Sequence, residues 1–239
     1  AAPIKGNVLD NDAVGADGHA QVTKVNGSAL EKGQVTLDGK YGTLTVYADG
    51  SYTYTLDNSK QEVQALKQGE LVEEEFNYSM RDADGDSRNA KLTIGITGQN
   101  DAPMINTDAK SVVSEEGLTG GIKDNNGNTD TTDAAVVIGQ INAKDIDHDA
   151  VLSYEFTGVP SEALTSNGQP VVWVLAPATN TVTGSANGNK VVELTLDSKK
   201  GEYTVTLHGP VDHPDKNIED TLDFNVPYQV KDEHGASAD

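Results

Sequence analysis

Aspartate clusters are the part of this sequence whose residue types and spacing could do chemistry. They fall at residues 10–17, 82–86 and 145–149, and aspartates stand at alternating positions in each. Hard cations such as calcium take six to eight oxygens from carboxylates, amides and main-chain carbonyls. Alternating carboxylates in a tight loop can converge on one such ion, and they repel one another without it. We therefore expect Ca²⁺ as the cofactor.

The clusters are not calcium-binding loops of the EF-hand type. That loop needs Gly at position six and Glu at position twelve. Counting from Asp82, these two positions hold Ser87 and Thr93. Counting from Asp145, they hold Ala150 and Phe156. The glycine-rich nonapeptide repeat of calcium-binding β-helices is also missing from the sequence. A second interpretation stays open, because Asp and Gly are common in turns and acidic turns keep a protein soluble.

Composition excludes several classes of partner. The chain has 239 residues, with 17 Lys plus Arg against 38 Asp plus Glu, and a formal net charge of −21. Nucleic acid and anionic lipid attract basic surfaces, so neither is an expected partner. No run of about 18 apolar residues predicts a membrane span, and the first residues lack the apolar core of a signal peptide. The absence of Cys excludes disulfides, thiolate catalysis and zinc–thiolate sites.

Alternation of apolar and polar residues predicts strands along most of the chain. Asp49-Gly50 between two alternating runs predicts a hairpin. The one good helical stretch is about residues 60–67. Many short strands with frequent turn signals predict an all-β fold of sandwiches. The apolar and alternating runs cover residues 42–48, 51–56, 76–81, 92–97, 136–141, 152–156, 192–196, 203–207 and 222–230.

A compact segment that ends in proline divides the chain. Residues 97–103 follow a predicted strand and read Thr-Gly-Gln-Asn-Asp-Ala-Pro. In each half, an aromatic-rich strand runs into an acidic turn that contains Gly, at residues 81–86 and 231–235, which indicates two related domains. We predict tandem domains at residues 1–101 and 102–239 joined by a short linker, and we expect the last strand of the second domain to be truncated.

Sandwich topology predicts which acidic loops meet. If residues 145–149 form the B–C loop of the second domain and Asp232 lies in its F–G loop, both meet the linker, and Glu70, Glu73 and Glu74 approach from the first domain. In the first domain, the loop at residues 10–17 meets the loop at residues 82–86. The sequence thus predicts two calcium sites. The predicted metal ligands are Asp10, Asp12, Asp17, Asp82, Asp84, Asn100, Asp101, Asp145, Asp147, Asp149 and Asp232.

Several longer motifs resemble known families. The first half carries Gly-Asn-Val-Leu-Asp-Asn-Asp at 6–12, Tyr-Gly-Thr-Leu-Thr-Val at 41–46, Ala-Asp-Gly-Ser-Tyr-Thr-Tyr at 48–54, Val-Gln-Ala-Leu at 63–66 and Asn-Asp-Ala-Pro at 100–103. Residues 1–103 therefore resemble the VCBS repeat, a cadherin-like module of giant bacterial surface adhesins. Residues 104–239 are similar to the longer repeat of type I secreted RTX adhesins, through residues 145–149, 167–168, 171–175 and Gly-Pro-Val-Asp-His-Pro-Asp at 209–215.

The resemblance implies tandem Ig-like (cadherin-like) Greek-key β-sandwiches with calcium between domains. We expect them to be calcium-rigidified extender modules of a large adhesin, which project a distal ligand-binding region in cell adhesion and biofilm formation. The implied partners are neighbouring repeats of the same chain and, through the parent adhesin, a host or surface glycan or peptide. We expect a secreted monomer at the bacterial cell surface. The alternative is a calcium-dependent carbohydrate- or peptide-binding module of the same adhesin.

An enzyme is not expected. His208 and His213 are the two histidines close enough in sequence to suggest a site, but proline-containing turns surround them. The glutamates at residues 73–75 have no opposing carboxylate placed by any pattern, and no nucleophile or nucleotide motif is present. A hydrolase in the second half is a third alternative. Trp173, the sole Trp, alternates with apolar neighbours, which predicts core packing and leaves a sugar-stacking platform as the alternative.

Overall fold

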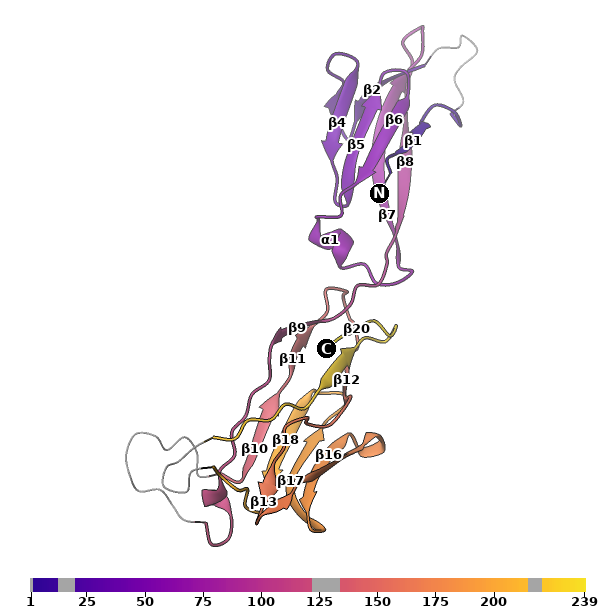
Figure 1. The fold of residues 1–239 in the computed structure, drawn as a ribbon. Coiled ribbons are helices and arrows are strands. Elements are labelled where there is room, and N and C mark those ends of the chain that lie inside the picture. Colours follow the sequence, from indigo (N-terminus) through magenta and orange to yellow (C-terminus); the bar gives the residue numbers. More distant parts are fainter. Residues whose placement is uncertain (1, 13–19, 122–133, 215–220) are drawn as a thin grey trace, which may run out of the picture. The chain divides into compact units, whose positions relative to one another are not determined.

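The chain divides into two compact units, Ala1–Asp101 (unit 1) and Ala102–Asp239 (unit 2). The computed structural model describes residues 2–12, 20–121, 134–214 and 221–239, so the predicted ligand Asp17 lies outside the described residues. Every strand pairing in both units is antiparallel, and the described residues contain one α-helix (Figure 1). The prediction of an all-β fold made of Ig-like sandwiches is confirmed.

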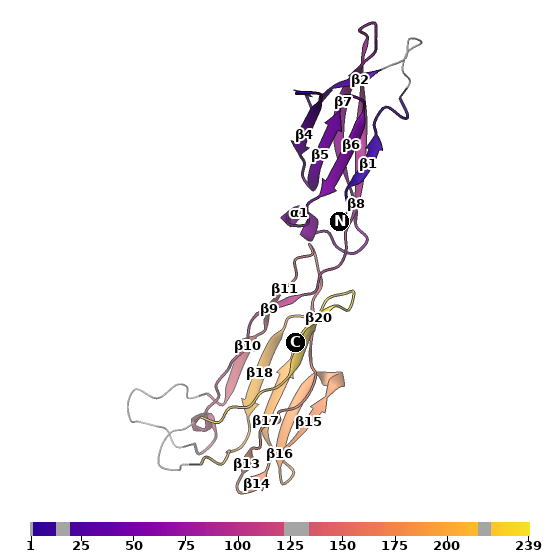
Figure 2. The same ribbon diagram turned by 45° about the horizontal axis from the view of Figure 1, so that its top comes forward.

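The first sheet of unit 1 has the strand order β1-β6-β5-β4 (Figure 2). Asp49 and Gly50 connect β5 to β6, where Gly50 has a φ of 85° and the Asp49 carboxylate accepts the Ser51 amide at 2.9 Å. The predicted hairpin is confirmed. The strands are β1 (Ile4–Asn7), β4 (Gln34–Asp38), β5 (Gly42–Tyr47) and β6 (Ser51–Leu56).

The second sheet of unit 1 has the order β3-β2-β7-β8. Its long hairpin pairs Leu71 with Thr97 at one end and Arg81 with Ser87 at the other, so residues 82–86 form the hairpin tip. Alternating residues of the two sheets, such as Leu44 and Phe76, meet in one core. The strands are β2 (Gln21–Val25), β3 (Ser28–Ala29), β7 (Leu71–Arg81) and β8 (Ser87–Thr97).

The helix predicted at about residues 60–67 is shorter in the structure. It is α1 (Gln61–Gln64), a single turn. The chain leaves the helix because Leu66 turns into the core of unit 1, where it is 5% exposed. One isolated turn has little stability of its own, so tertiary packing decides where it ends.

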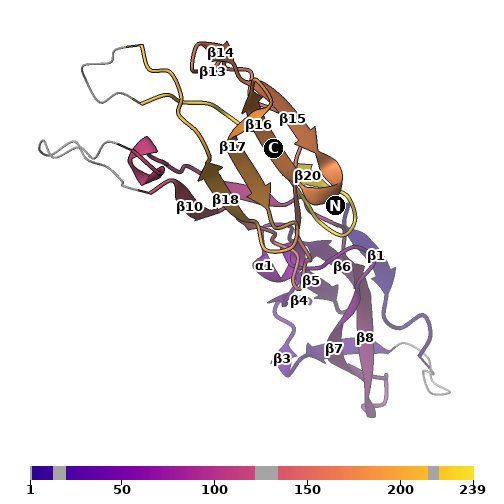
Figure 3. The same ribbon diagram turned by 90° about the horizontal axis from the view of Figure 1, so that it is seen from below.

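Unit 2 is built on a five-stranded sheet with the order β10-β18-β17-β16-β15 (Figure 3). Its strands are β10 (Val136–Gln140), β15 (Val172–Ala176), β16 (Thr181–Ala186), β17 (Asn189–Leu196) and β18 (Glu202–Leu207). The remaining elements are β9 (Met104–Thr107), η1 (Glu115–Gly117), β11 (Asn142–Lys144), β12 (Ser153–Phe156), β13 (Thr165–Ser166), β14 (Gln169–Pro170), η2 (Pro177–Thr179), β19 (Tyr228–Lys231) and β20 (Ser237–Ala238).

In the described part of unit 2, three smaller sheets accompany the large one, with the orders β12-β19-β20, β11-β9 and β13-β14. The core between them and the large sheet is formed by buried residues such as Ile141, Val182 and Val230. The long strand expected at residues 222–230 is present only as β19. Pro227 has no amide proton to donate to a ladder, which explains why the strand begins after it.

Candidate metal-binding loops

Two acidic loops of unit 2 lie at the same end of one small sheet. Asp145 and Asp147 lie in the connection from β11 to β12, and Asp232 directly follows β19. Ser153 of β12 is paired with Lys231 of β19, and the Val151 amide donates to a Glu233 carboxylate oxygen at 2.8 Å. Strand pairing therefore brings together two loops that are about 80 positions apart, as the sequence predicts for Asp145, Asp147 and Asp232.

The carboxylates of these loops are unusually buried. Asp147 is 5% exposed and Asp232 is 6% exposed. The Asp232 carboxylate accepts the amides of His234 at 2.8 Å and Ala236 at 2.9 Å, and Asp145 accepts the Asp147 amide at 2.9 Å. Aspartate is rarely this buried unless its charge is compensated by partners or by a metal. Main-chain amides supply part of that compensation.

Asp145 shows the electrostatic cost of this arrangement. Burial raises the pKa of its carboxyl, and the negative charges of Asp147 and Asp232 raise it further. Among the described residues, none donates a hydrogen bond to its buried Oδ2 atom. A divalent cation would reverse both effects, because it supplies positive charge and a ligand for that oxygen.

The acidic loops lie where the chain enters unit 2. The first strand, β9, pairs with β11, and Met104 lies opposite Lys144. Residues just before Met104 and just after Lys144 therefore belong to the same end of unit 2. The linker residues Asn100 and Asp101 lie in unit 1, where the Asn100 amide nitrogen of the main chain donates to Gln68 at 3.0 Å. Their predicted part in this metal site remains a prediction.

Asp149 differs from the other predicted ligands of the same loop. It is exposed and has a φ of 57°, in the left-handed region that Asp tolerates better than most residues. Its exposed position fits the turn of the loop. Its role as a ligand remains a prediction.

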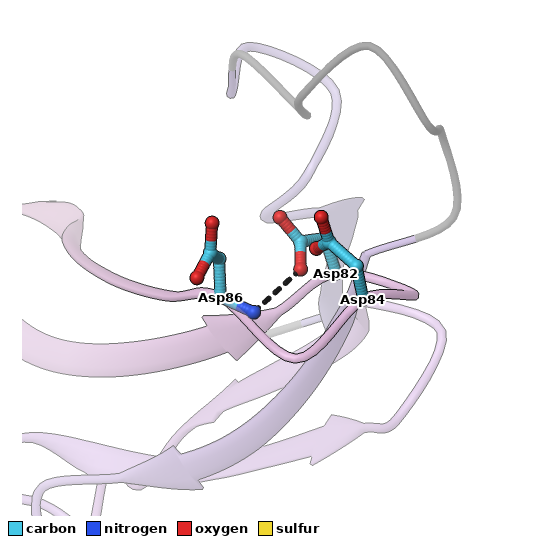
Figure 4. Close-up of side chains that lie close together, drawn as sticks. All are labelled: Asp82, Asp84 and Asp86. Atoms are coloured by element: carbon cyan, nitrogen blue, oxygen red, sulfur yellow. Dashed lines mark hydrogen bonds between the residues drawn. The ribbon is translucent and has the colours of Figure 1, made fainter.

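Unit 1 has its own acidic cluster at the β7–β8 hairpin tip. One carboxylate oxygen from each of Asp82, Asp84 and Asp86 lies within 4.8 Å of the other two (Figure 4). Asp82 accepts the amides of Asp86 at 2.7 Å and Gly85 at 3.1 Å. This is the only such acidic or histidine group among the described residues. Asp86 was not among the predicted ligands, although its alternating spacing with Asp82 and Asp84 was a visible signal.

The hairpin tip is exposed. The interaction between the Asp82 and Asp84 carboxyl groups lowers the pKa of Asp82 and raises the pKa of Asp84. Unlike the loops of unit 2, this cluster is in contact with solvent, so water stabilises much of its charge. It can supply several oxygens to a cation, and it would bind one more weakly if no other ligands joined it.

The predicted meeting of the N-terminal loop with this tip is only partly visible. Asp12 accepts a hydrogen bond from the Tyr78 hydroxyl at 2.6 Å, which ties the end of the N-terminal segment to β7. Desolvation and this hydrogen bond raise the pKa of Tyr78. Asp10 lies two residues earlier, and its amide donates to the Asn7 carbonyl at 3.5 Å. Neither aspartate belongs to the group of three described above.

Glu74 was expected to approach the calcium site of the second domain, and this expectation is wrong. Its side chain is 8% exposed and lies in the core of unit 1. It accepts the Tyr54 hydroxyl at 2.6 Å and the Tyr41 amide at 3.4 Å, and the Lys40 amide also donates to it. The alternation of β7 explains the difference, because every second residue from Glu74 to Met80 points inward.

His208 and His213 lie beside different carboxylates. His208 lies 3.8 Å from a Glu193 carboxylate oxygen, whereas His213 lies 3.7 Å from Glu115. Trp173 is partly buried against Phe224, with ring centroids 5.2 Å apart. Its predicted packing against the core is confirmed.

Comparison with known proteins points in the same direction as the geometry. Residues 1–98 match the family of the bacterial cadherin-like domain. The calcium-binding lectin RapA2 of Rhizobium johnstonii is 31% identical over 123 residues, which cover 49% of this chain and 51% of the lectin. The chain thus spans about half the length of that curated relative. These similarities indicate a structural or binding protein rather than an enzyme.

None of the helices in the described residues is long and apolar enough to cross a membrane.

Proposed function

We propose that this chain is a calcium-stabilised adhesion module of a bacterial surface protein. In the finer form of the proposal, its two units are a VCBS-type repeat and a repeat of type I secreted RTX adhesins. They act as extenders that hold a distal ligand-binding region away from the cell, in adhesion and biofilm formation. Their partners would be neighbouring repeats of the same chain, and the module itself would be a monomer.

The observation that carries the proposal is the pair of buried carboxylates in unit 2. Asp147 and Asp232 are at least nine-tenths buried, and they raise the pKa of the adjacent Asp145. Such a group is costly in an empty site and favourable around a divalent cation. The similarity to a cadherin-like domain and to a protein named as a calcium-binding lectin supports the choice of calcium.

If the linker residues Asn100 and Asp101 bind the ion held by the loops of unit 2, the chain becomes stiffer at the linker. Asp101 stands three residues before Met104, whose partner Lys144 precedes Asp145. Oxygens from Asn100 and Asp101 on the same ion would restrict bending at the linker. Extracellular calcium modules bind with a Kd of about 10⁻⁴ to 10⁻³ M, which matches calcium outside cells and not in the cytosol. The chain could then cross a secretion channel unfolded and fold outside.

Calcium titration of the whole chain tests this proposal, with thermal unfolding and small-angle X-ray scattering as readouts. At about ten times Kd, each site adds about 1.4 kcal/mol to the free energy of unfolding. We expect a rise in Tm together with a more extended and less variable scattering profile. EDTA should reverse both changes, and magnesium at the same concentration should reproduce little of either.

Paired variants identify the site. Asp147→Asn and Asp232→Asn should each abolish most of the calcium-dependent rise in the Tm of unit 2. Asp223→Asn is the control. It removes one exposed carboxylate of the same unit and should keep the calcium-dependent rise in Tm. If neither Tm nor scattering responds to millimolar calcium, the acidic loops are solvated turns and the proposal fails.

A second candidate function is recognition of a saccharide by the same adhesin. It is favoured by the similarity to a protein named as a lectin and by an open groove in unit 2 whose lining is both polar and aliphatic. A glycan array probed with the full chain, with calcium and with EDTA, separates this function from a plain extender. Binding of any glycan above background supports recognition, and a blank array supports the extender alone.

A further inference from the structure

Two neighbouring segments of unit 2, residues 104–114 and 134–144, are hydrogen-bonded to each other through their main chains at both ends but not in between. At one end, β9 pairs with β11, with Thr107 opposite Asn142. At the other end, the Ser114 amide donates to the Ala134 carbonyl at 2.8 Å. Between these points, no main-chain hydrogen bond in the described part of the chain joins residues 108–112 to β10, although the segment runs beside it (Figure 1). A groove of about 570 Å³ lies between them.

Two tyrosines hold the separated segment in place. The Tyr203 ring crosses β10 at Gly139, where a Cβ atom would lie 2.2 Å from the ring. Its hydroxyl then reaches Ser111 at 2.7 Å. The Ala109 main chain also interacts with the Tyr228 hydroxyl. These contacts hold residues 108–112 away from β10 and keep the groove open. The segment would have to break them to close the groove.

The lining of this groove is suited to a ligand rich in hydroxyl groups. Asp108, Lys110 and Asn142 are exposed and offer acceptors and donors in several directions. Ile138 is 64% exposed and Val112 is 52% exposed, so the C–H face of a ring has aliphatic surface to pack against. The lining contains one carboxylate and one ammonium group, so it favours neither anions nor cations. The volume lies in the range of small-molecule sites.

An extended peptide is a poorer match for the same groove. Strand addition needs a regular row of free main-chain groups along an edge. The register between β9 and β11 shifts between Asn142 and Ala143, at the end of the groove. The row of main-chain groups that β10 offers is therefore short, because the strand has five residues and the bulge follows soon after it.

We infer that this groove is the binding site for a short neutral saccharide, a mono- or disaccharide unit. The inference rests on the second candidate function above and gives it a location. The ligand would lie with one ring face on Ile138 and Val112, and its hydroxyl groups would bond to Asp108, Lys110 and Asn142.

Titration of the ¹⁵N-labelled full chain with maltose, cellobiose and lactose, followed by amide chemical shifts, tests the inference. With at least one of these sugars, we expect saturable shifts of the amides that line the groove, such as Ser111 and Gly139. Lys110→Ala and Asn142→Ala should each weaken that binding at least fivefold. Asn106→Ala is the matched control, because Asn106 lines the neighbouring groove and not this one.

The outcomes separate this inference from the calcium proposal. Calcium-dependent Tm is measured on the same samples, so a calcium response without saturable sugar shifts at the groove rejects the saccharide site alone. Shifts that saturate elsewhere, or that persist in both groove variants, reject it too. A threonine–valine peptide that shifts the groove amides when no sugar does would reassign the groove to peptides and overturn the inference.

Discussion

The charge of the Asp145 carboxylate affects both the stability of the metal-free fold and the binding of a cation. Its pKa is raised in the folded state, so the folded protein binds the proton more tightly than the unfolded chain. The contribution of Asp145 to the free energy of unfolding therefore falls as pH rises from the pKa of an unfolded Asp, near 3.9, through the folded value. Above both values, the metal-free loop is destabilised by its charge.

Asp145→Asn should consequently have opposite effects with and without calcium. In EDTA at neutral pH, we expect the variant to be more stable than the parent by up to about 1 kcal/mol, because one buried charge is gone. In saturating calcium, the order should reverse. Urea unfolding at both conditions measures the difference, and a variant that is less stable in EDTA would contradict the electrostatic account.

Asn180 is a polar cross-link in the core of unit 2. Its side chain accepts the Phe156 amide at 2.8 Å and donates to the carbonyls of Tyr154 and Leu196, both at 3.0 Å. It therefore ties β12 to β17, across the two sheets, from a backbone position with a φ of 49°.

Asn180→Ala should lower the free energy of unfolding of unit 2 by about 3 kcal/mol. Three hydrogen bonds at roughly 0.5–1.5 kcal/mol each are lost, and Ala adds about 1 kcal/mol of strain at a positive φ. Asn187→Ala is the matched control, since Asn187 has a φ of 47° but is exposed. Denaturant unfolding of both variants separates the two contributions, and equal losses would show that backbone strain alone is responsible.

At the scale of elements, two glycines in the strands of unit 1 have opposite surroundings. A Cβ atom at Gly42 of β5 would lie 2.4 Å from the Thr55 carbonyl and 2.7 Å from the Tyr54 hydroxyl. A Cβ atom at Gly95 of β8 would meet nothing closer than a Leu71 methyl group at 3.6 Å. The first glycine is required by the close approach of two strands, and the second is not.

Gly42→Ala should therefore destabilise unit 1 by about 1–3 kcal/mol, through overpacking against β6. Gly95→Ala should be neutral or stabilising by about 0.4–1 kcal/mol, because it reduces the freedom of the unfolded chain. Thermal unfolding of the pair provides the test. A similar loss of stability in both would mean that the backbone approach at Gly42 is not what matters.

The elements also show how far the sequence predicts this fold. Alternation placed β5 and β6 correctly and found the C-terminal parts of β7 and β8, but it missed the first five residues of each of these two long strands. The strand expected at residues 222–230 failed at Pro227, where backbone chemistry outweighs alternation. Glu74 was expected beside the predicted calcium site because it is acidic. Its burial depends on Tyr54 and on the main chain near Tyr41, partners that are distant in sequence.

The candidate site was predictable to a similar degree. Sandwich topology predicted that the loops of Asp145 and Asp232 meet, and strand pairing brings these two loops together. The burial of Asp147 could not be predicted, because it depends on how the loops fold over the end of the sheet. Main-chain donors such as the Ala236 amide leave no trace in the sequence.

At the scale of the whole molecule, the net charge of −21 governs the response to ions. Self-repulsion of this charge destabilises the compact state, and salt screens it, with a Debye length that falls from about 30 Å at 0.01 M to about 8 Å at 0.15 M. In EDTA, adding sodium chloride over this range should raise Tm gradually and without saturation.

Calcium should act differently from sodium at equal ionic strength. Its effect should saturate at millimolar concentration and should exceed the screening effect, because it fills specific sites as well as screening charge. Differential scanning calorimetry with matched ionic strength separates the two. A calcium curve that coincides with the sodium curve would reduce the role of calcium to screening.

The way the chain enters unit 2 has a mechanical consequence. The first strand, β9, is held by a ladder of three residue pairs with β11, from Thr107–Asn142 to Met104–Lys144. A pulling force transmitted along the chain from residue 102 loads the Met104–Lys144 pair before it reaches the five-stranded sheet. Asp145 stands next to that pair, so an ion held there would be among the first bonds under tension. The force that this module withstands would then be set by the calcium concentration around it rather than by its hydrophobic core.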